Sequence, residues 1–187
     1  MSITFRPLDA SDLPRLAAWL MEPHVRKFYQ PAPITLAEVT AEYAPMIGNH
    51  TSTICHLAVS AEAPFAYVQS YRNLAYPEWA DMIAVRDGIS VDLFIGDPAF
   101  LHRGFGRALL DAYVTQVAFA HFRTETRAYI AHATANTTAL RCSQAAGFRP
   151  LREFMEDGVP TRLLMRDAVK RATLSSPSPS SGREGVG

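Results

Sequence analysis

The sequence predicts an α+β domain with a mixed, mostly antiparallel central sheet flanked by helices. Three observations support this class. Two alternating segments meet at Ala63-Pro64 as an antiparallel hairpin, residues 88–147 run strand, helix, strand and helix, and two further strands follow. A doubly wound fold is excluded, because its strands and helices alternate strictly along the whole chain.

The N-terminal part predicts one strand and one helix. Residues 3–8 alternate between apolar and polar, as a strand with one buried face does. Asp9 or Ser11 can cap the helix that follows, whose apolar residues keep helical spacing. Pro23 is expected to end that helix.

A capping box marks the second helix, since Thr35 is followed three residues later by Glu38. The hairpin strands come next, at 52–60 and 65–72. Residues 73–87 are predicted to form a loop, because proline and acidic residues interrupt any periodicity.

The rest of the chain predicts four strands and two helices. In order, these are a strand at 88–95, a helix at 104–119, a strand at 126–132, a helix at 136–145, and strands at 148–154 and 161–167. Gly147 closes the second of these helices. The domain is expected to span residues 1–172, followed by a disordered Ser/Pro/Gly-rich tail at 173–187.

Composition and charge exclude several classes of protein. Hydrophobic residues make up 48% of the 187 residues and charged residues 19%, which is typical of a globular domain. Eighteen Lys+Arg balance eighteen Asp+Glu, so no basic surface is expected to bind nucleic acid. No apolar stretch reaches the roughly 18 residues that span a bilayer, so no membrane partner is expected. The sequence does not indicate an oligomeric state.

Cysteine and histidine usage indicates a reducing location without a metal site. Cys55 and Cys142 cannot form a disulfide framework. Arg6 and Asp9 fall where a signal peptide would need its apolar run, so a cytoplasmic protein is expected. The six histidines lack ligand spacing, and no metal is predicted.

A glycine-containing loop precedes the predicted helix at 104–119. Gly104 and Gly106 would let backbone N–H groups point at a phosphate near the helix N-terminus. Arg103 and Arg107 flank the loop and can pair with phosphate oxygens. A tight turn before a helix is the alternative interpretation. The dinucleotide signature is absent because Leu109 stands at its third glycine, and no P-loop sequence occurs.

A second motif extends from Asn136 to Phe148 and by itself is a capped helix ending at Gly147. Together with the Arg-Gly-x-Gly loop and the element order, it resembles the GNAT superfamily of N-acetyltransferases over residues 3–167. The resemblance implies a GNAT fold and acetyl-CoA as the acetyl donor. It implies that the cofactor-binding residues are Phe94, Ile95, Leu101, His102, Arg103, Gly104, Phe105, Gly106, Arg107, Asn136 and Ala139.

A narrower resemblance concerns the acceptor. Gln69-Ser70-Tyr71 and the run from Asp92 to Pro98 are similar to motifs of the aminoglycoside 6'-N-acetyltransferases. They imply a small-molecule aminoglycoside or polyamine acceptor. The expected substrate-binding residues are Gln69, Tyr71, Glu78, Trp79, Asp81 and Asp92. An acidic segment with a tryptophan suits a polycationic sugar, and a solvated loop is the alternative.

Two residues are expected to act in catalysis. The resemblance places Asp92 at the acceptor amine, as binding carboxylate and base, whereas a solvent-facing carboxylate is the alternative. It also implies that a backbone N–H near Leu93–Ile95 polarises the carbonyl, where the strand splays from its neighbour. Ser143 stands where many GNAT enzymes carry a tyrosine acid for the CoA thiolate, and its hydroxyl can hydrogen-bond sulfur.

Two departures from the family pattern leave alternatives open. With Ser143 in the tyrosine position, Tyr71 or Tyr129 is an alternative acid. Ala131-His132 stands where the aminoglycoside enzymes often have Asp-Pro, so one expected carboxylate is missing. Three functions remain. The first is acetylation of an aminoglycoside or related aminocyclitol, the second is acetylation of a siderophore lysine or hydroxylamine, a polyamine or a protein N-terminus, and the third is non-catalytic acyl-CoA binding.

Overall fold

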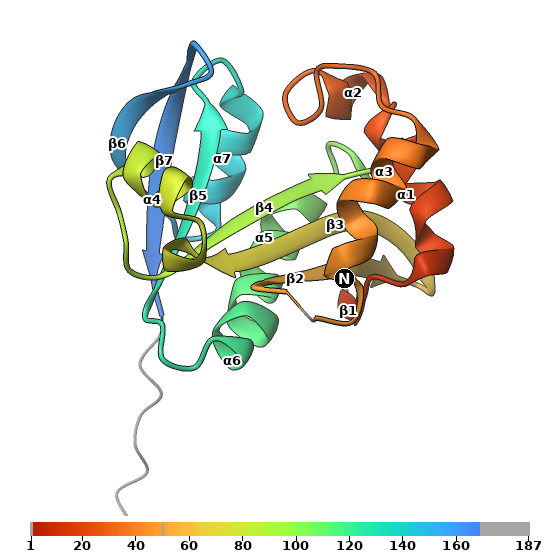
Figure 1. Ribbon diagram of the computed structural model, residues 1–187, viewed down its shortest axis with the longest axis horizontal. Coiled ribbons are helices and arrows are strands. Elements are labelled where there is room, and N and C mark those ends of the chain that lie inside the picture. Colours follow the sequence, from red (N-terminus) through yellow and green to blue (C-terminus); the bar gives the residue numbers. More distant parts are fainter. Residues whose placement is uncertain (1, 50, 169–187) are drawn as a thin grey trace, which may run out of the picture.

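The computed structural model describes residues 2–49 and 51–168, which form a seven-stranded sheet in the order β1-β2-β3-β4-β5-β7-β6 (Figure 1). The strands are β1 (Thr4–Pro7), β2 (Thr53–Ser60), β3 (Ala63–Arg72), β4 (Ile89–Ile95), β5 (Arg127–Ala133), β6 (Arg149–Glu156) and β7 (Val159–Asp167). Every neighbouring pair is antiparallel except β4 and β5, which are parallel. The predicted mixed, mostly antiparallel sheet is confirmed.

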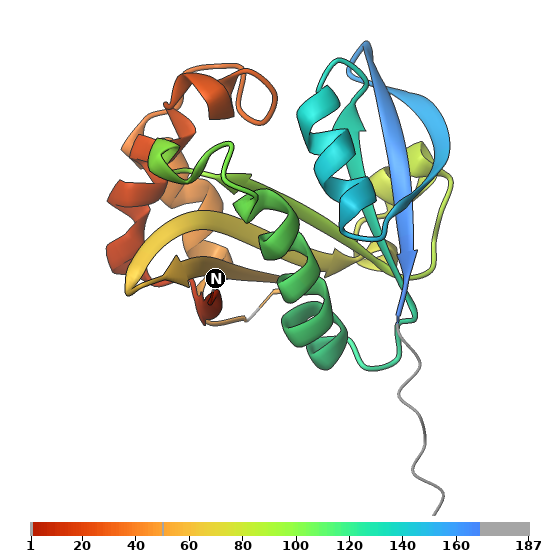
Figure 2. The ribbon, with the colours of Figure 1, turned by 180° about the vertical axis from the view of Figure 1, so that it is seen from behind.

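Helices cover both faces of this sheet. They are α1 (Leu13–Leu20), α2 (Pro23–Arg26), α3 (Leu36–Tyr43), α4 (Pro77–Ile83), α5 (Phe105–Tyr113), α6 (Phe119–His121) and α7 (Thr137–Ala145). Figure 1 shows α1, α3 and α4 on one face, and Figure 2 shows α5, α6 and α7 on the other. Alternate residues of β4 supply the two cores: Val91 packs beneath α5, and Phe94 packs beneath α1 and α3.

β4 and β5 stay paired only at their first residues. The pairs are Ile89 with Ala128 and Ser90 with Tyr129, and beyond them the two strands diverge (Figure 1). The splay expected from the resemblance is therefore present. It leaves the second half of β4 without a strand partner on its β5 side.

The N-terminal caps follow the sequence closely. Of the two predicted caps, Asp9 is used: it accepts a hydrogen bond from the Ser11 N–H at 2.9 Å and caps a 3-10 turn, η1 (Ala10–Asp12), that leads into α1. α1 itself begins after Asp12 without a side-chain cap. The capping box between Thr35 and Glu38 is confirmed at the start of α3. α1 ends at Leu20, and two residues separate it from α2, which begins at Pro23.

Two expected elements differ from the structure. The prediction of a loop at 73–87 is wrong, because a short 3-10 turn, η3 (Asn73–Ala75), and α4 lie there. Pro77 occupies the first position of α4, where its missing N–H costs nothing. The expected helix at 104–119 is interrupted after α5 by a π-helical turn, η5 (Val114–Ala118). The predicted tail at 173–187 lies outside the described residues.

Candidate active site

Asp92 lies in the middle of β4, and Gln69 lies directly opposite it on β3. The Gln69 amide donates to Asp92 Oδ2 at 2.9 Å, and the Tyr67 hydroxyl donates to Gln69 Oε1 at 2.7 Å. Burial raises the pKa of Asp92 above its usual value, and hydrogen bonding from Gln69 and Tyr71 opposes that shift. The carboxylate is therefore held in place on the face of the sheet that α1 and α3 cover.

A hollow of about 260 Å³ opens on this same face, beside Asp92. Its lining residues are Glu42, Met46, Thr53, Gln69, Tyr71, Tyr76 and Trp79. Three of the predicted substrate-binding residues, Gln69, Tyr71 and Trp79, therefore come together. The Trp79 indole N–H donates to Ser90 Oγ at 2.8 Å, which fixes the ring at the edge of the hollow.

The remaining acidic residues divide between this hollow and the outer surface. Glu42 lines the hollow. The pKa of Glu156 is raised, mainly by burial and to a lesser extent by the negative charge of Asp92. Glu78 and Asp81 are exposed on α4 and do not line it, and Asp81 is paired with Arg86. The sequence missed Glu42 and Glu156 because they lie on distant elements, and only a three-dimensional contact could reveal them.

The loop before α5 is open at its glycine. Gly104 has φ +80° and caps α5 without a side chain, and a Cβ built there would meet no atom within 4 Å. Arg103 and Arg107 are exposed on either side of it. The uncapped N–H groups of the helix, an approach free of side chains and two guanidinium groups fit the pyrophosphate of a nucleotide thioester.

Other residues of this loop have local structural roles. His102 is exposed with φ +57°, Leu101 is partly buried, and Phe105 is buried against Phe65 and Phe100. Gly106 lies so close to α7 that an added Cβ would be 3.1 Å from Cys142 Sγ. The glycine therefore allows the loop and α7 to approach each other.

The expected cofactor residues outside the loop have mixed placements. Asn136 Oδ1 accepts from the Ala139 N–H at 3.2 Å, so this side chain caps α7. The Ile95 side chain packs beside α5, on the side of the glycine loop. The Phe94 side chain lies on the opposite face against Tyr29, so only its backbone lies at the splay.

Ser143 is buried on α7 and makes a contact that the sequence did not predict. Its Oγ lies 2.8 Å from Nε2 of His132, near the end of β5. Burial lowers the pKa of His132 to about 4, so its imidazole is neutral at pH 7. Tyr71 and Tyr129, the alternative acids, belong to the other face, in the hollow and in the α4 core respectively.

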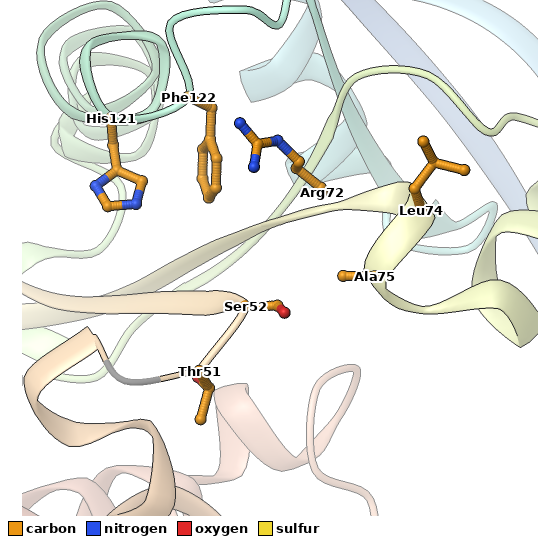
Figure 3. Close-up of a pocket in the computed structure, with 7 residues that line it drawn as sticks. All are labelled: Thr51, Ser52, Arg72, Leu74, Ala75, His121 and Phe122. Atoms are coloured by element: carbon orange, nitrogen blue, oxygen red, sulfur yellow. The ribbon is translucent and has the colours of Figure 1, made fainter.

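A second hollow, of about 300 Å³, lies away from these groups. Thr51, Ser52, Arg72, Leu74, Ala75, His121 and Phe122 line it (Figure 3). It contains none of the predicted site residues. Arg72 is already engaged there, by an ion pair to Glu125 and by stacking on Phe122.

Two absences hold for residues 2–49 and 51–168. No helix in these ranges is long and apolar enough to cross a membrane. No group of three or more His, Cys, Asp or Glu side chains in the same ranges is arranged to hold a metal ion.

The splayed sheet, the glycine loop before α5 and the carboxylate on β4 define an acyltransferase of the nucleotide-thioester type. The chain belongs to the GNAT acetyltransferases, whose acetyl donor is acetyl-CoA: the model of the acetyltransferase (GNAT) domain matches residues 9–155. It is similar to the aminoglycoside N(6')-acetyltransferases type 1 of Klebsiella pneumoniae and Serratia marcescens. Each is 27% identical over 154 residues, covering 79% of this chain and 74% of the relative.

Solved structures give the same picture. AAC(6')-Ib in complex with paromomycin and acetyl-CoA superposes with a TM-score of 0.80 at 25% identity, covering 89% of this chain and 94% of that one. AAC(6')-Ib with coenzyme A and kanamycin superposes with a TM-score of 0.78 at 25% identity, covering 89% and 95%. The GNAT fold expected from the sequence is confirmed.

Proposed function

We propose that this protein transfers the acetyl group of acetyl-CoA directly to an amine of an aminoglycoside or related aminocyclitol. The observation that carries the proposal is the position of Asp92. Its carboxylate lies at the splay of β4 and β5, held by Gln69 and next to an aromatic hollow. A carboxylate beside tyrosine and tryptophan rings suits a cationic sugar amine.

The hollow carries enough negative charge for an acceptor with several amines. Glu42 lines it, and Glu156 is close enough to Asp92 for their charges to interact. These two carboxylates stand in for the one that is missing at Ala131-His132. Glu78 and Asp81, on the outer side of α4, would act only by attracting the cation over a longer range.

The two faces of the sheet divide the work of the reaction. The glycine loop, Arg103 and Arg107 would hold the donor on the α5 side, which brings a thioester carbonyl to the splay. Asp92, on the other side, holds the acceptor ammonium. The nitrogen loses one proton to solvent before it attacks, and Asp92 takes the second as the C–N bond forms. Its raised pKa makes it a better base than an ordinary aspartate. Orientation of the two reactants supplies much of the rate.

An acceptor screen tests this function. CoA release is measured with acetyl-CoA and kanamycin, tobramycin, lysine or spermidine, and turnover with the two aminoglycosides is expected. Turnover only with lysine or spermidine would refute the aminoglycoside assignment. Binding of acetyl-CoA without turnover of any amine would instead identify a non-catalytic binding domain.

A cytoplasmic location is part of the same proposal. Both cysteines are free, and Cys55 is buried. Unpaired cysteines are typical of reducing compartments, and acetyl-CoA would be available there.

A further inference from the structure

We propose that His132 is a positioning residue that orients the Ser143 hydroxyl as a hydrogen-bond donor to the sulfur leaving the acetyl donor. The inference rests on the proposed function, because it presupposes that a CoA thioester binds at the splay. It assigns a role to a histidine that no sequence motif singles out.

The geometry places the pair on the donor side of the sheet. Side chains alternate along β5, and Ile130, two residues before His132, packs in the core beneath α5 and α7. The His132 side chain points to the same face and meets Ser143, which is 1% exposed. The last residue pair that joins β4 to β5 is Ser90 with Tyr129. His132 follows Tyr129 on β5, so it and its partner Ser143 lie where the two strands have separated.

The glycine loop borders the same region. Cys142, the neighbour of Ser143 on α7, packs against Gly106. α7 therefore borders the loop that would hold the donor through Cys142 and meets β5 through Ser143. Asp92 faces the opposite side of the sheet, so the amine and the departing sulfur are served from opposite faces.

The protonation state of His132 decides which way the hydrogen bond runs. The charged group nearest to it in register is Arg162 on β7, whose guanidinium is paired with Glu153. The neutral ring carries one N–H. With that proton on Nε2, His132 donates to Ser143 Oγ, and the serine keeps its own proton for another acceptor.

The proton balance follows directly. The bound ammonium first releases one proton to solvent, and Asp92 takes the second proton from the nitrogen as the C–N bond forms. Ser143 donates a hydrogen bond to the sulfur as the C–S bond breaks and the electron pair moves onto it. Water then protonates the thiolate, and no proton leaves His132. The pair stabilises the leaving group without acting as a strong acid, which a serine could not be.

The ionisation of bound CoA tests this role without any acceptor. The thiol of CoA is titrated in its complexes by the ultraviolet absorbance of the thiolate. The variants are Ser143→Ala, His132→Phe and His132→Gln, whose amide N–H replaces the ring donor. Burial raises the pKa of Cys55 to about 11 and raises that of Cys142. The titration of each variant without CoA is subtracted, so that ionisation of the protein's own groups does not enter the midpoint.

The expected result is a difference of about one pH unit in the thiol midpoint. The bound thiol should ionise at lower pH in the wild-type and His132→Gln complexes than in those of Ser143→Ala and His132→Phe. kcat should fall about tenfold in the latter two variants, with the KM for acetyl-CoA unchanged. The double variant Ser143→Ala/His132→Phe should lose no more kcat than Ser143→Ala alone, because the two changes remove the same interaction.

One outcome refutes the inference and leaves the proposed function intact. In that outcome the wild-type enzyme acetylates aminoglycosides, but the thiol of bound CoA has the same midpoint in the wild-type and Ser143→Ala complexes. Failure of the wild-type protein to bind CoA would refute both. Thermal unfolding shows whether each variant is folded. If His132→Phe does not fold, the comparison of the wild type with Ser143→Ala still tests the inference.

Discussion

The side-chain amide of Gln69 donates to the carboxylate of Asp92 across the β3–β4 pair, at 2.9 Å. The amide is itself oriented, because Tyr67 donates to its oxygen. A hydrogen bond to the ionised form of an acid favours that form, whereas burial disfavours it. The pKa of Asp92 is therefore raised by burial and lowered by hydrogen bonding from Gln69 and Tyr71, and the contribution of Gln69 can be removed by mutation.

The first prediction concerns the pH dependence of Gln69→Leu. Loss of the donor raises the pKa of Asp92 further, since burial is then less opposed. The acidic limb of kcat/KM for the acceptor should move to higher pH, because in the proposed mechanism Asp92 holds the ammonium and takes a proton only when it is ionised. The profile is measured from pH 5 to 9. Gln116→Leu, on the exposed side of η5, serves as the control, and an unmoved limb in Gln69→Leu would contradict the role of Asp92.

The second prediction separates the function of Asp92 from its effect on stability. The folded protein keeps a proton on Asp92 at pH values where the unfolded chain has released it. Its free energy of unfolding therefore falls as the pH rises from the ordinary value of 3.8 through the raised pKa. Asp92→Asn removes this dependence, so its Tm at pH 7 should be higher than that of the wild type.

Activity should change in the opposite direction. If Asp92 is the base and the partner of the ammonium, as proposed, Asp92→Asn should lower kcat/KM for the acceptor at least 100-fold. The Kd for acetyl-CoA stays unchanged, because Asp92 faces away from the glycine loop. Calorimetric melting and titration with acetyl-CoA measure the two effects. A large loss of acetyl-CoA affinity would show that Asp92 belongs to the donor site instead.

The third prediction compares two glycines with the same backbone. Gly104 has φ +80° and Gly158, in the turn between β6 and β7, has φ +81°, and an added Cβ at either position meets no atom within 4 Å. Alanine at each position should cost about 1 kcal/mol through the left-handed conformation alone. Only Gly104→Ala should also weaken acetyl-CoA binding, about tenfold, because its methyl group obstructs the approach of phosphate. Equal affinities of the two variants would exclude this loop as the phosphate site.

The sequence predicted the sheet well and the contacts between distant elements poorly. The hairpin, the capping box at Thr35 and the glycine loop are local patterns, and local patterns carry their own evidence. The sequence did not predict α4, because this helix is only seven residues long and the burial of Ala80 and Ile83 depends on packing against other elements. Tyr76 provides no side-chain cap, so Pro77 was the only sequence signal for the start of this helix, and a proline equally indicates a loop.

The site shows the same limit. Gln69 and Asp92 could be placed together because both resembled motifs of one family. His132 and Ser143 lie 11 residues apart on a strand and a helix, and no spacing rule predicts that they touch. Glu42 and Glu156 belong to the first and last thirds of the chain. Only the fold shows that Glu42 lines the hollow and that the charges of Glu156 and Asp92 interact.

The last prediction tests whether Trp79 binds the acceptor or only supports the fold. Its indole N–H donates to Ser90, which donates in turn to Asn73 at 2.7 Å. Trp79→Phe keeps an aromatic ring but removes the first of these hydrogen bonds. It should cost about 1 kcal/mol, or about 2–4 °C in Tm for a domain of this size. The KM for the acceptor should rise only slightly, since the ring still lines the hollow.

Trp79→Ala removes the ring as well, and the KM for kanamycin should then rise about tenfold while the KM for acetyl-CoA stays constant. The matched control is Trp19→Phe. Trp19 is buried in the α1 core against Gly96, so this change should lower Tm without affecting either KM. Steady-state kinetics at 25 °C, well below each Tm, measure these values. If Trp79→Ala lowers Tm but leaves the KM for kanamycin unchanged, the tryptophan supports the strand and does not contact the acceptor, because a stacked sugar would lose affinity with the ring.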